Sequence, residues 1–185
     1  HLPVVVYLSE HYGLTIGDAR ACDNDALCMA SRNSHLPVVQ YLSEHYGLTI
    51  DDARACNNYA LRGASENGDL SMVRYLAEHY QLTREDARMH SSGALCMAGY
   101  NGHLSVVKYL IGHFQYLERA DVHGALCWAS AHGHLSVVKC IIEYFQHLAL
   151  VDADFKEALR WANANDHSSV VRYLSEHFQH RIHNH

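Results

Sequence analysis

Histidine and cysteine are the residues of this sequence most able to do chemistry. The chain of 185 residues contains seventeen histidines and six cysteines. Imidazole and thiolate are preferred ligands of zinc, and a Cys–His pair is the core of one class of nucleophilic site. A site of either kind needs its residues at one place, whereas a structural role can recur at a fixed interval.

Most of the histidines recur at such an interval. A His-Leu dipeptide, or its stand-in, returns every 31 to 34 residues, and a further histidine lies about ten residues after it in most copies. We predict that these histidines are structural, the first set bonding to the backbone and the second lying at helix C-termini. They are His1, His35, His103, His134 and His167, and His11, His45, His79, His113 and His177.

The remaining histidines and the cysteines do not suggest a metal site. His177 and His180 would share a helix face and bind nickel or zinc only adventitiously, because no carboxylate or cysteine completes the set. No CxxC motif is present, which excludes a zinc ribbon. Cys28, Cys96 and Cys127 occupy equivalent positions in their units, and such positions in neighbouring units would be about 10 Å apart, too far for a disulfide. The sequence therefore predicts free thiols in a reducing compartment, no metal and no cofactor.

The interval is set by a repeating pair of helices. Ala26, Leu27 and Ala30 have helical spacing and recur one unit later, so we expect a first helix with a small-residue face. Leu36, Val39 and Leu42 share one face of a second helix. Glycine-containing turns such as 101–103 join the two helices.

The connectors between units carry a further pattern. Thr-x-x-Asp-Ala-Arg occurs at 15–20, 49–54 and 83–88. Threonine is a good N-cap and an acid suits the first turn, so we predict a third, very short helix there. Near the start of the last unit, Asp154 and Glu157 resemble a capping box.

These patterns predict an all-α solenoid of stacked helix-turn-helix repeats forming a single domain over 1–185. Each pair of helices buries its apolar face only against its neighbours. By sequence, the units are 1–23 (partial), 24–57, 58–91, 92–123, 124–156, and 157–185 with the tail.

The unit resembles an ankyrin repeat. The segment 94–110 contains Gly102-His103-Leu104-Ser105-Val106-Val107, which matches the G-H-L-x-V-V core of that family, and five units carry this core with small changes. The T-P-L-H opening and the hairpin sequence are absent, so short helical or irregular fingers are expected in place of β-hairpins. The resemblance implies a non-catalytic scaffold that binds a protein partner through its concave face.

The resemblance also implies where a partner would bind, namely the fingers and the ends of the first helices. Positions at the helix ends differ from unit to unit, whereas Ala30, Ala64, Ala98 and Ala129 do not change. Trp128 and Trp161 share one position and are expected to fill the core or a groove. The candidate binding residues are Arg32, Asn33, Cys56, Asn58, Glu66, Asn67, His90, Tyr100, Asn101, His123 and His132.

The composition of the chain excludes several classes of protein. With 49% apolar and 18% charged residues the chain is not disordered, and no apolar run is long enough to cross a membrane. The net charge of −6 makes nucleic acid an unexpected partner, although a basic column of Arg74, Lys108, Lys139 and Arg172 keeps that alternative open. A small-molecule ligand is not expected, and the predicted location is the cytoplasm, of a host cell if the protein is an effector.

Two further possibilities concern the whole protein. The chain could be the recruiting arm of a larger enzyme or effector, and a single deep pocket holding His123 and a carboxylate such as Asp121 would favour catalysis here. His1 begins inside a second helix and the last unit keeps an interior apolar pattern. We therefore expect the chain to be part of a longer array, or to associate end to end.

Overall fold

The computed structural model describes residues 1–88, 93–114, 119–144 and 152–183, and within these ranges every regular element is a helix. The predicted all-α solenoid is confirmed. The first helices of the units are α3 (Ala21–Arg32), α6 (Ala55–Asn67), α9 (Ala94–Tyr100), α11 (Arg119–Ala131) and α13 (Asp152–Ala164). The second helices are α1 (Leu2–Tyr12), α4 (Leu36–Tyr46), α7 (Leu70–His79), α10 (Leu104–His113), α12 (Leu135–Tyr144) and α14 (Ser168–His183).

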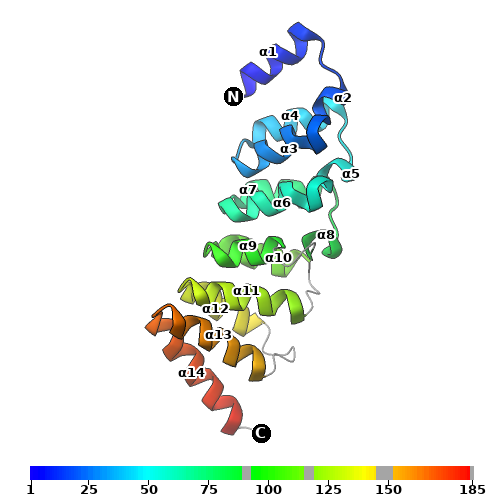
Figure 1. Cartoon of the computed structure of the whole chain (residues 1–185). Coiled ribbons are helices and arrows are strands. Elements are labelled where there is room, and N and C mark those ends of the chain that lie inside the picture. Colours follow the sequence, from blue (N-terminus) through cyan, green and yellow to red (C-terminus); the bar gives the residue numbers. More distant parts are fainter. Residues whose placement is uncertain (89–92, 115–118, 145–151, 184–185) are drawn as a thin grey trace.

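The helices form a stack that runs from the N-terminus to the C-terminus (Figure 1). First helices pack on first helices, as α3 does on α6 and α11 on α13, and second helices form a parallel layer in which α10 contacts α7 and α12. Each contact therefore joins units that are neighbours in sequence. The repeat boundaries themselves stay a prediction.

The core lies between the two layers and is continuous along the stack. Small residues such as Ala64, Ala98 and Ala129 are fully buried in the first helices, where they allow neighbouring helices to approach closely. Val107 and Leu110 of α10 are also buried, as the spacing of apolar residues in the second helices predicts. Among the described residues, no helix is long and apolar enough to span a membrane.

The three predicted short helices are present as α2 (Ile16–Ala19), α5 (Ile50–Ala53) and α8 (Arg84–Arg88). They line one edge of the stack in Figure 1. In α5, the Thr49 backbone N–H and hydroxyl donate to Asp52 Oδ2 at 2.7 and 3.1 Å. Arg20 of the preceding unit donates to both oxygens of the same carboxylate at 2.7 and 2.9 Å. Asp52 thus caps its own helix and joins two units, and Asp86 repeats the arrangement with Thr83 and Arg54.

A left-handed turn lies within the first residues of α3 and of α6, directly after the short helix. Cys22, Asp23 and Asn24 all have positive φ, and Cys56, Asn57 and Asn58 repeat this conformation. Asparagine and aspartate tolerate the left-handed region better than most residues, because their side chains bond locally to the backbone. These turns redirect the chain from the edge of the stack into the longer C-terminal parts of α3 and α6.

Three histidines of the first recurring set, His103, His134 and His167, bond to the backbone of the preceding unit, as predicted. His134 Nε2 donates to the Tyr100 carbonyl at 2.9 Å, and the ring packs against Gly102, whose φ is +75°. A Cβ on Gly102 would lie 2.5 Å from His134 Nδ1. The same joint is formed by His103 with Glu66 and Gly68, and by His167 with Ala131 and Gly133.

The capping box expected at Asp154 is wrong. Helix α13 begins at Asp152, so Asp154 and Glu157 both lie inside it. The Asp154 carboxylate is buried and faces His123 of the preceding unit.

Candidate partner-binding face

The ends of α3 and α6 carry a small charged patch. Arg32 donates to the Tyr59 hydroxyl at 2.7 Å and pairs with Glu66 at 3.4 Å. The guanidinium carbon of Arg62 also lies over the Tyr59 ring, 5.8 Å from the ring centroid. Both Arg32 and Glu66 remain more than one-third exposed, so the two predicted binding residues lie together on the surface.

Three of the predicted asparagines, at the ends of first helices, already make hydrogen bonds within the protein. The Asn33 amide donates to the Met29 carbonyl at 2.8 Å and the Asn101 amide to the Met97 carbonyl at 3.1 Å. Each caps the end of its own helix. Asn67 donates across units to the Ser34 hydroxyl at 2.7 Å.

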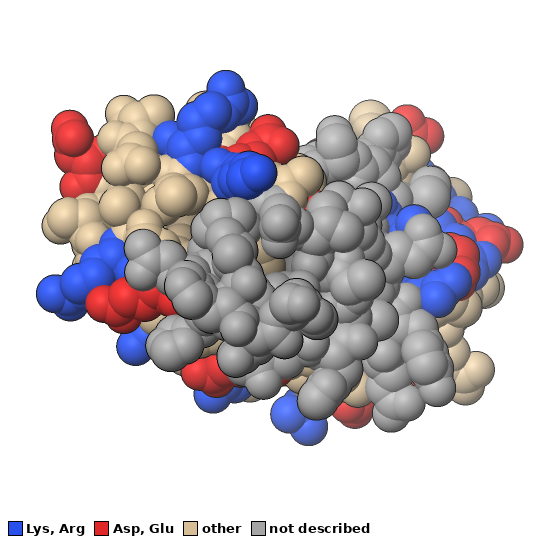
Figure 2. All heavy atoms as spheres, turned by 90° about the horizontal axis from the view of Figure 1, so that it is seen from below, with Lys and Arg blue, Asp and Glu red and all other residues tan. Residues whose placement is uncertain are grey.

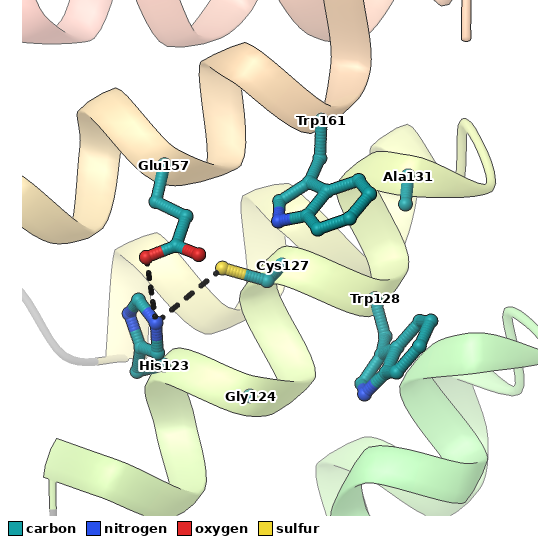
Figure 3. A pocket seen from close by; sticks show the side chains of 7 residues that line it. All are labelled: His123, Gly124, Cys127, Trp128, Ala131, Glu157 and Trp161. Carbon is teal, nitrogen blue, oxygen red and sulfur yellow. Dashed lines mark hydrogen bonds and ion pairs between the residues drawn. The ribbon is translucent and has the colours of Figure 1, made fainter. Parts of the chain in front are cut away.

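An aromatic cluster lies at the ends of the following first helices, α9 and α11. The Tyr100 ring centroid is 4.0 Å from that of His132 and 5.5 Å from that of Trp128. Trp128 is 42% exposed and Trp161 is 40% exposed. The two tryptophans are therefore not in the core. Their side chains extend away from the helix stack and line a pocket (Figure 3).

The predicted finger residues do not gather at one place. Cys56 is exposed and its Sγ lies 3.8 Å from the Asp23 carbonyl oxygen. Asn58 is 1% exposed, because the left-handed turn directs its side chain inward. His90 lies outside the described residues. His123 is partly exposed and points into the pocket between α11 and α13 (Figure 3).

The pocket around His123 has a volume of about 180 Å³ and contains groups of three kinds. His123 Nδ1 lies 2.8 Å from Asp154 Oδ1, and its Nε2 lies 3.4 Å from Glu157 Oε2. The same Nε2 is 3.7 Å from Cys127 Sγ. An imidazole, a thiol and a carboxylate thus converge beside the two tryptophans.

Cys127 is poorly suited to act as a nucleophile. Burial, with the nearby charges of Glu157 and Asp154, raises the pKa of its thiol to about 12. A nucleophilic cysteine requires the opposite shift, because the thiolate is the reactive form. The pocket therefore offers no activated Cys–His pair, and the Asp121 side chain lies outside the described part of the structure.

Cys127, Asp154 and Glu157 were not predicted from the sequence as partners of His123. One signal was present, because His123 and Cys127 are four residues apart and share a helix face. The carboxylates could not be placed, since their approach depends on how α13 packs against α11.

Two residues of the basic column on the second helices pack against aromatic rings of the next unit. The Arg74 guanidinium lies over the Tyr109 ring at 5.2 Å, and the Lys139 ammonium lies over the Tyr173 ring at 5.3 Å. In the end-on view of Figure 2, positive and negative side chains are interspersed on the visible face. Neither observation favours a phosphate-binding stripe.

Comparison with known protein families supports the repeat assignment. A model described as "Ankyrin repeats (3 copies)" matches residues 95–184, and one described as "Ankyrin repeats (many copies)" matches residues 27–77. The chain belongs to the ankyrin repeat family. A search of curated proteins finds no match. Ankyrin repeats generally mediate protein–protein interaction, and ankyrin repeat proteins are typically non-catalytic scaffolds.

Proposed function

We propose that this ankyrin repeat chain is a non-catalytic scaffold that binds a protein partner through the concave face formed by the ends of its first helices. The observation that carries the proposal is the exposed row of Arg32, Glu66, Tyr100, Trp128 and Trp161. Tryptophan, tyrosine and arginine contribute most of the binding energy of protein interfaces. Exposed aromatic side chains also lower the solubility of a protein that has no partner bound.

The contrast between these positions and the framework supports the same proposal. Ala64, Ala98 and Ala129 are buried and identical in every unit, since the helix spacing leaves room only for a methyl group. The exposed helix-end positions carry a different residue in almost every unit. Asn58 is left out of the proposed face because it is buried, and Trp128 and Trp161 are added to it.

A quantitative capture experiment tests the face. The wild-type chain and a triple variant, Arg32→Glu with Tyr100→Ala and Trp128→Ala, would be immobilised at equal density and exposed to the same cell extract. We expect the triple variant to lose at least about tenfold of the specifically retained protein, because hot-spot residues each contribute about 2 kcal/mol or more.

The control is Lys108→Ala, an exposed substitution on the second-helix layer. It should retain partners as the wild type does. An equal set and amount of captured protein for the wild type and the triple variant, with both folded by circular dichroism, would rule out this face.

A further inference from the structure

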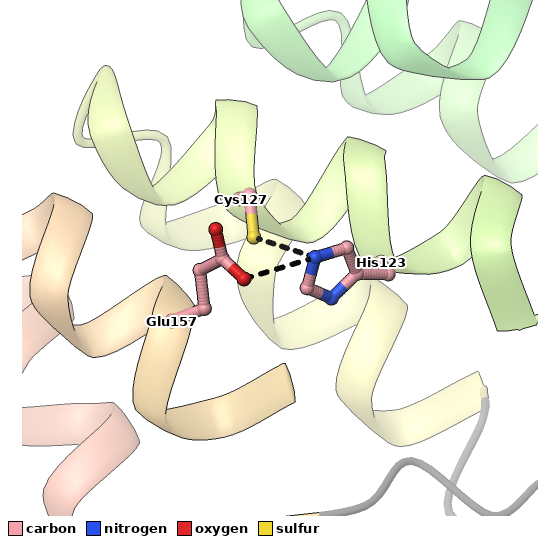
Figure 4. Close-up of side chains that lie close together, drawn as sticks. All are labelled: His123, Cys127 and Glu157. Carbon is pink, nitrogen blue, oxygen red and sulfur yellow. Dashed lines mark hydrogen bonds and ion pairs between the residues drawn. The ribbon is translucent and has the colours of Figure 1, made fainter. Parts of the chain in front are cut away.

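We propose that His123, Cys127 and Glu157 form a zinc site that joins α11 to α13. The three side chains each offer one ligand atom, and these atoms all lie within 4.8 Å of one another (Figure 4). The proposal departs from the sequence-based expectation of no metal, and it is independent of the protein-binding face.

The distances suit a tetrahedral cation. Typical bond lengths of zinc to imidazole, thiolate and carboxylate separate the nitrogen from the sulfur by about 3.6 Å and from the oxygen by about 3.4 Å. In the structure, His123 Nε2 lies 3.7 Å from Cys127 Sγ and 3.4 Å from Glu157 Oε2. These two separations match those that a bound ion would require, and the third pair, Cys127 Sγ and a Glu157 carboxylate oxygen, lies within 4.8 Å.

A second carboxylate lies against the other nitrogen of the His123 ring. Asp154 has a side chain only 2% exposed, and its Oδ1 lies 2.8 Å from His123 Nδ1. The negative charge of an ionised carboxylate at this distance favours a proton on Nδ1, which leaves the lone pair on Nε2. That lone pair faces Cys127 and Glu157.

The nature of the ligands selects the ion. A mixed set of imidazole nitrogen, sulfur and carboxylate oxygen favours zinc over calcium or magnesium, which prefer oxygen alone. Three protein ligands leave one tetrahedral position for water, and the pocket lined by Trp128 and Trp161 lies beside the cluster (Figure 3).

The combination occurs at only one of the corresponding places in the repeats. Cys28 and Cys96 are equivalent to Cys127, but the residues four positions earlier are Asn24 and Ser92. The residues that correspond to Glu157 are Tyr59 and Gly124 in those two cases. A framework requirement would place the same residues at each junction, whereas a specific site occurs once.

A simpler account is a protonated His123 held between Asp154 and Glu157. It explains the two carboxylates and leaves Cys127 as a neutral hydrogen-bond partner of His123 Nε2. The two accounts differ in whether Cys127 becomes a thiolate ligand, and that difference can be measured directly.

Titration with Co²⁺ alone, a spectroscopic substitute for zinc, tests the site in the full chain without an added histidine tag. We expect a near-ultraviolet thiolate-to-cobalt charge-transfer band that saturates at stoichiometric metal and is displaced by Zn²⁺. Cys127→Ser should abolish the band, and the matched control Cys28→Ser should keep it. Binding by histidines elsewhere in the chain gives no such band.

Two further variants test the geometry and do not depend on the thiol. Glu157→Gln changes a partly exposed side chain and should weaken cobalt binding at least tenfold without unfolding the protein. Asp154→Asn tests the positioning role and should weaken binding by about 10–100-fold while keeping the band. No band at stoichiometric Co²⁺, or a band that survives Cys127→Ser, would overturn the proposal; so would unchanged affinity in Glu157→Gln.

Discussion

Gly102 and His134 show how single residues set the joint between units. The His134 ring occupies the space that a side chain at position 102 would need, and its Nε2 bonds to the preceding unit. Where the glycine is replaced by Ser34, the next unit carries Asp69 in place of the histidine, and that carboxylate accepts a hydrogen bond from Met72 N within its own unit. The residues on the two sides of the joint therefore change together.

Gly102→Ala should destabilise the protein by at least about 1–2 kcal/mol. The cost has two sources, the positive φ of +75° and the displacement of the His134 ring by the new methyl group. Chemical denaturation followed by circular dichroism measures the change. Gly112→Ala is the control, because Gly112 lies in α10 with nothing within 4 Å of an added Cβ. That variant should be neutral or stabilised by up to about 1 kcal/mol, and equal destabilisation of both variants would contradict this account of the joint.

At the scale of elements, the short helices link units through buried carboxylates. Burial acts to raise the pKa of Asp86, but hydrogen bonds from Arg54 and Thr83 outweigh it, so the pKa lies below its ordinary value. The same balance lowers the pKa of Asp52, with Arg20 and Thr49 as the donors.

The lowered pKa of Asp86 predicts a specific dependence of stability on pH. As pH falls, the unfolded chain takes up the proton first, so the stabilisation is complete above the unfolded-state pKa of about 3.9 and is lost as pH falls through the lower folded-state value. Between about pH 5 and about pH 2, Asp86→Asn should lose less stability than the wild type. Urea denaturation at each pH tests this.

The control for the acid experiment is Asp51→Asn. The Asp51 side chain is 89% exposed and lies 4.0 Å from Arg54. It does not cap α5, so this variant should follow the wild-type curve. Identical curves for Asp86→Asn and the wild type would show that the Arg–Asp link adds nothing to stability.

At the scale of the whole molecule, the helix contacts of the described residues join neighbouring units, which implies that stability is distributed along the stack. Leu174 of α14 and Leu76 of α7 are both fully buried, the first in the last unit and the second in the middle. Replacing either by alanine should cost about 2–5 kcal/mol locally.

Hydrogen exchange distinguishes the two positions. Leu174→Ala should accelerate amide exchange in α13 and α14 while leaving α3 and α4 as protected as in the wild type. Leu76→Ala should accelerate exchange in the units on both sides of α7. Uniform acceleration along the whole chain in Leu174→Ala would show that the array unfolds as one cooperative unit instead.

The repeat and its helices could be predicted from sequence because each depends on patterns within one unit. The capping pattern Thr49 to Asp52 and the small-residue face of α6 are local and recur. The left-handed turn at 56–58 was not foreseen, since asparagine permits that conformation without requiring it. The cluster at His123 depends on how α11 and α13 pack together, which no pattern within one unit encodes.

The joints between units also bear on how such a protein gains or loses repeats during evolution. The Arg–Asp links and the His–Gly joints use the same partners at successive boundaries, so a unit copied next to itself meets neighbours that already fit it. The ten-residue string shared by 7–16 and 41–50 is the kind of trace that such tandem copying leaves in a gene. Growth and shrinkage in whole units would therefore preserve the fold while altering the surface available to a partner.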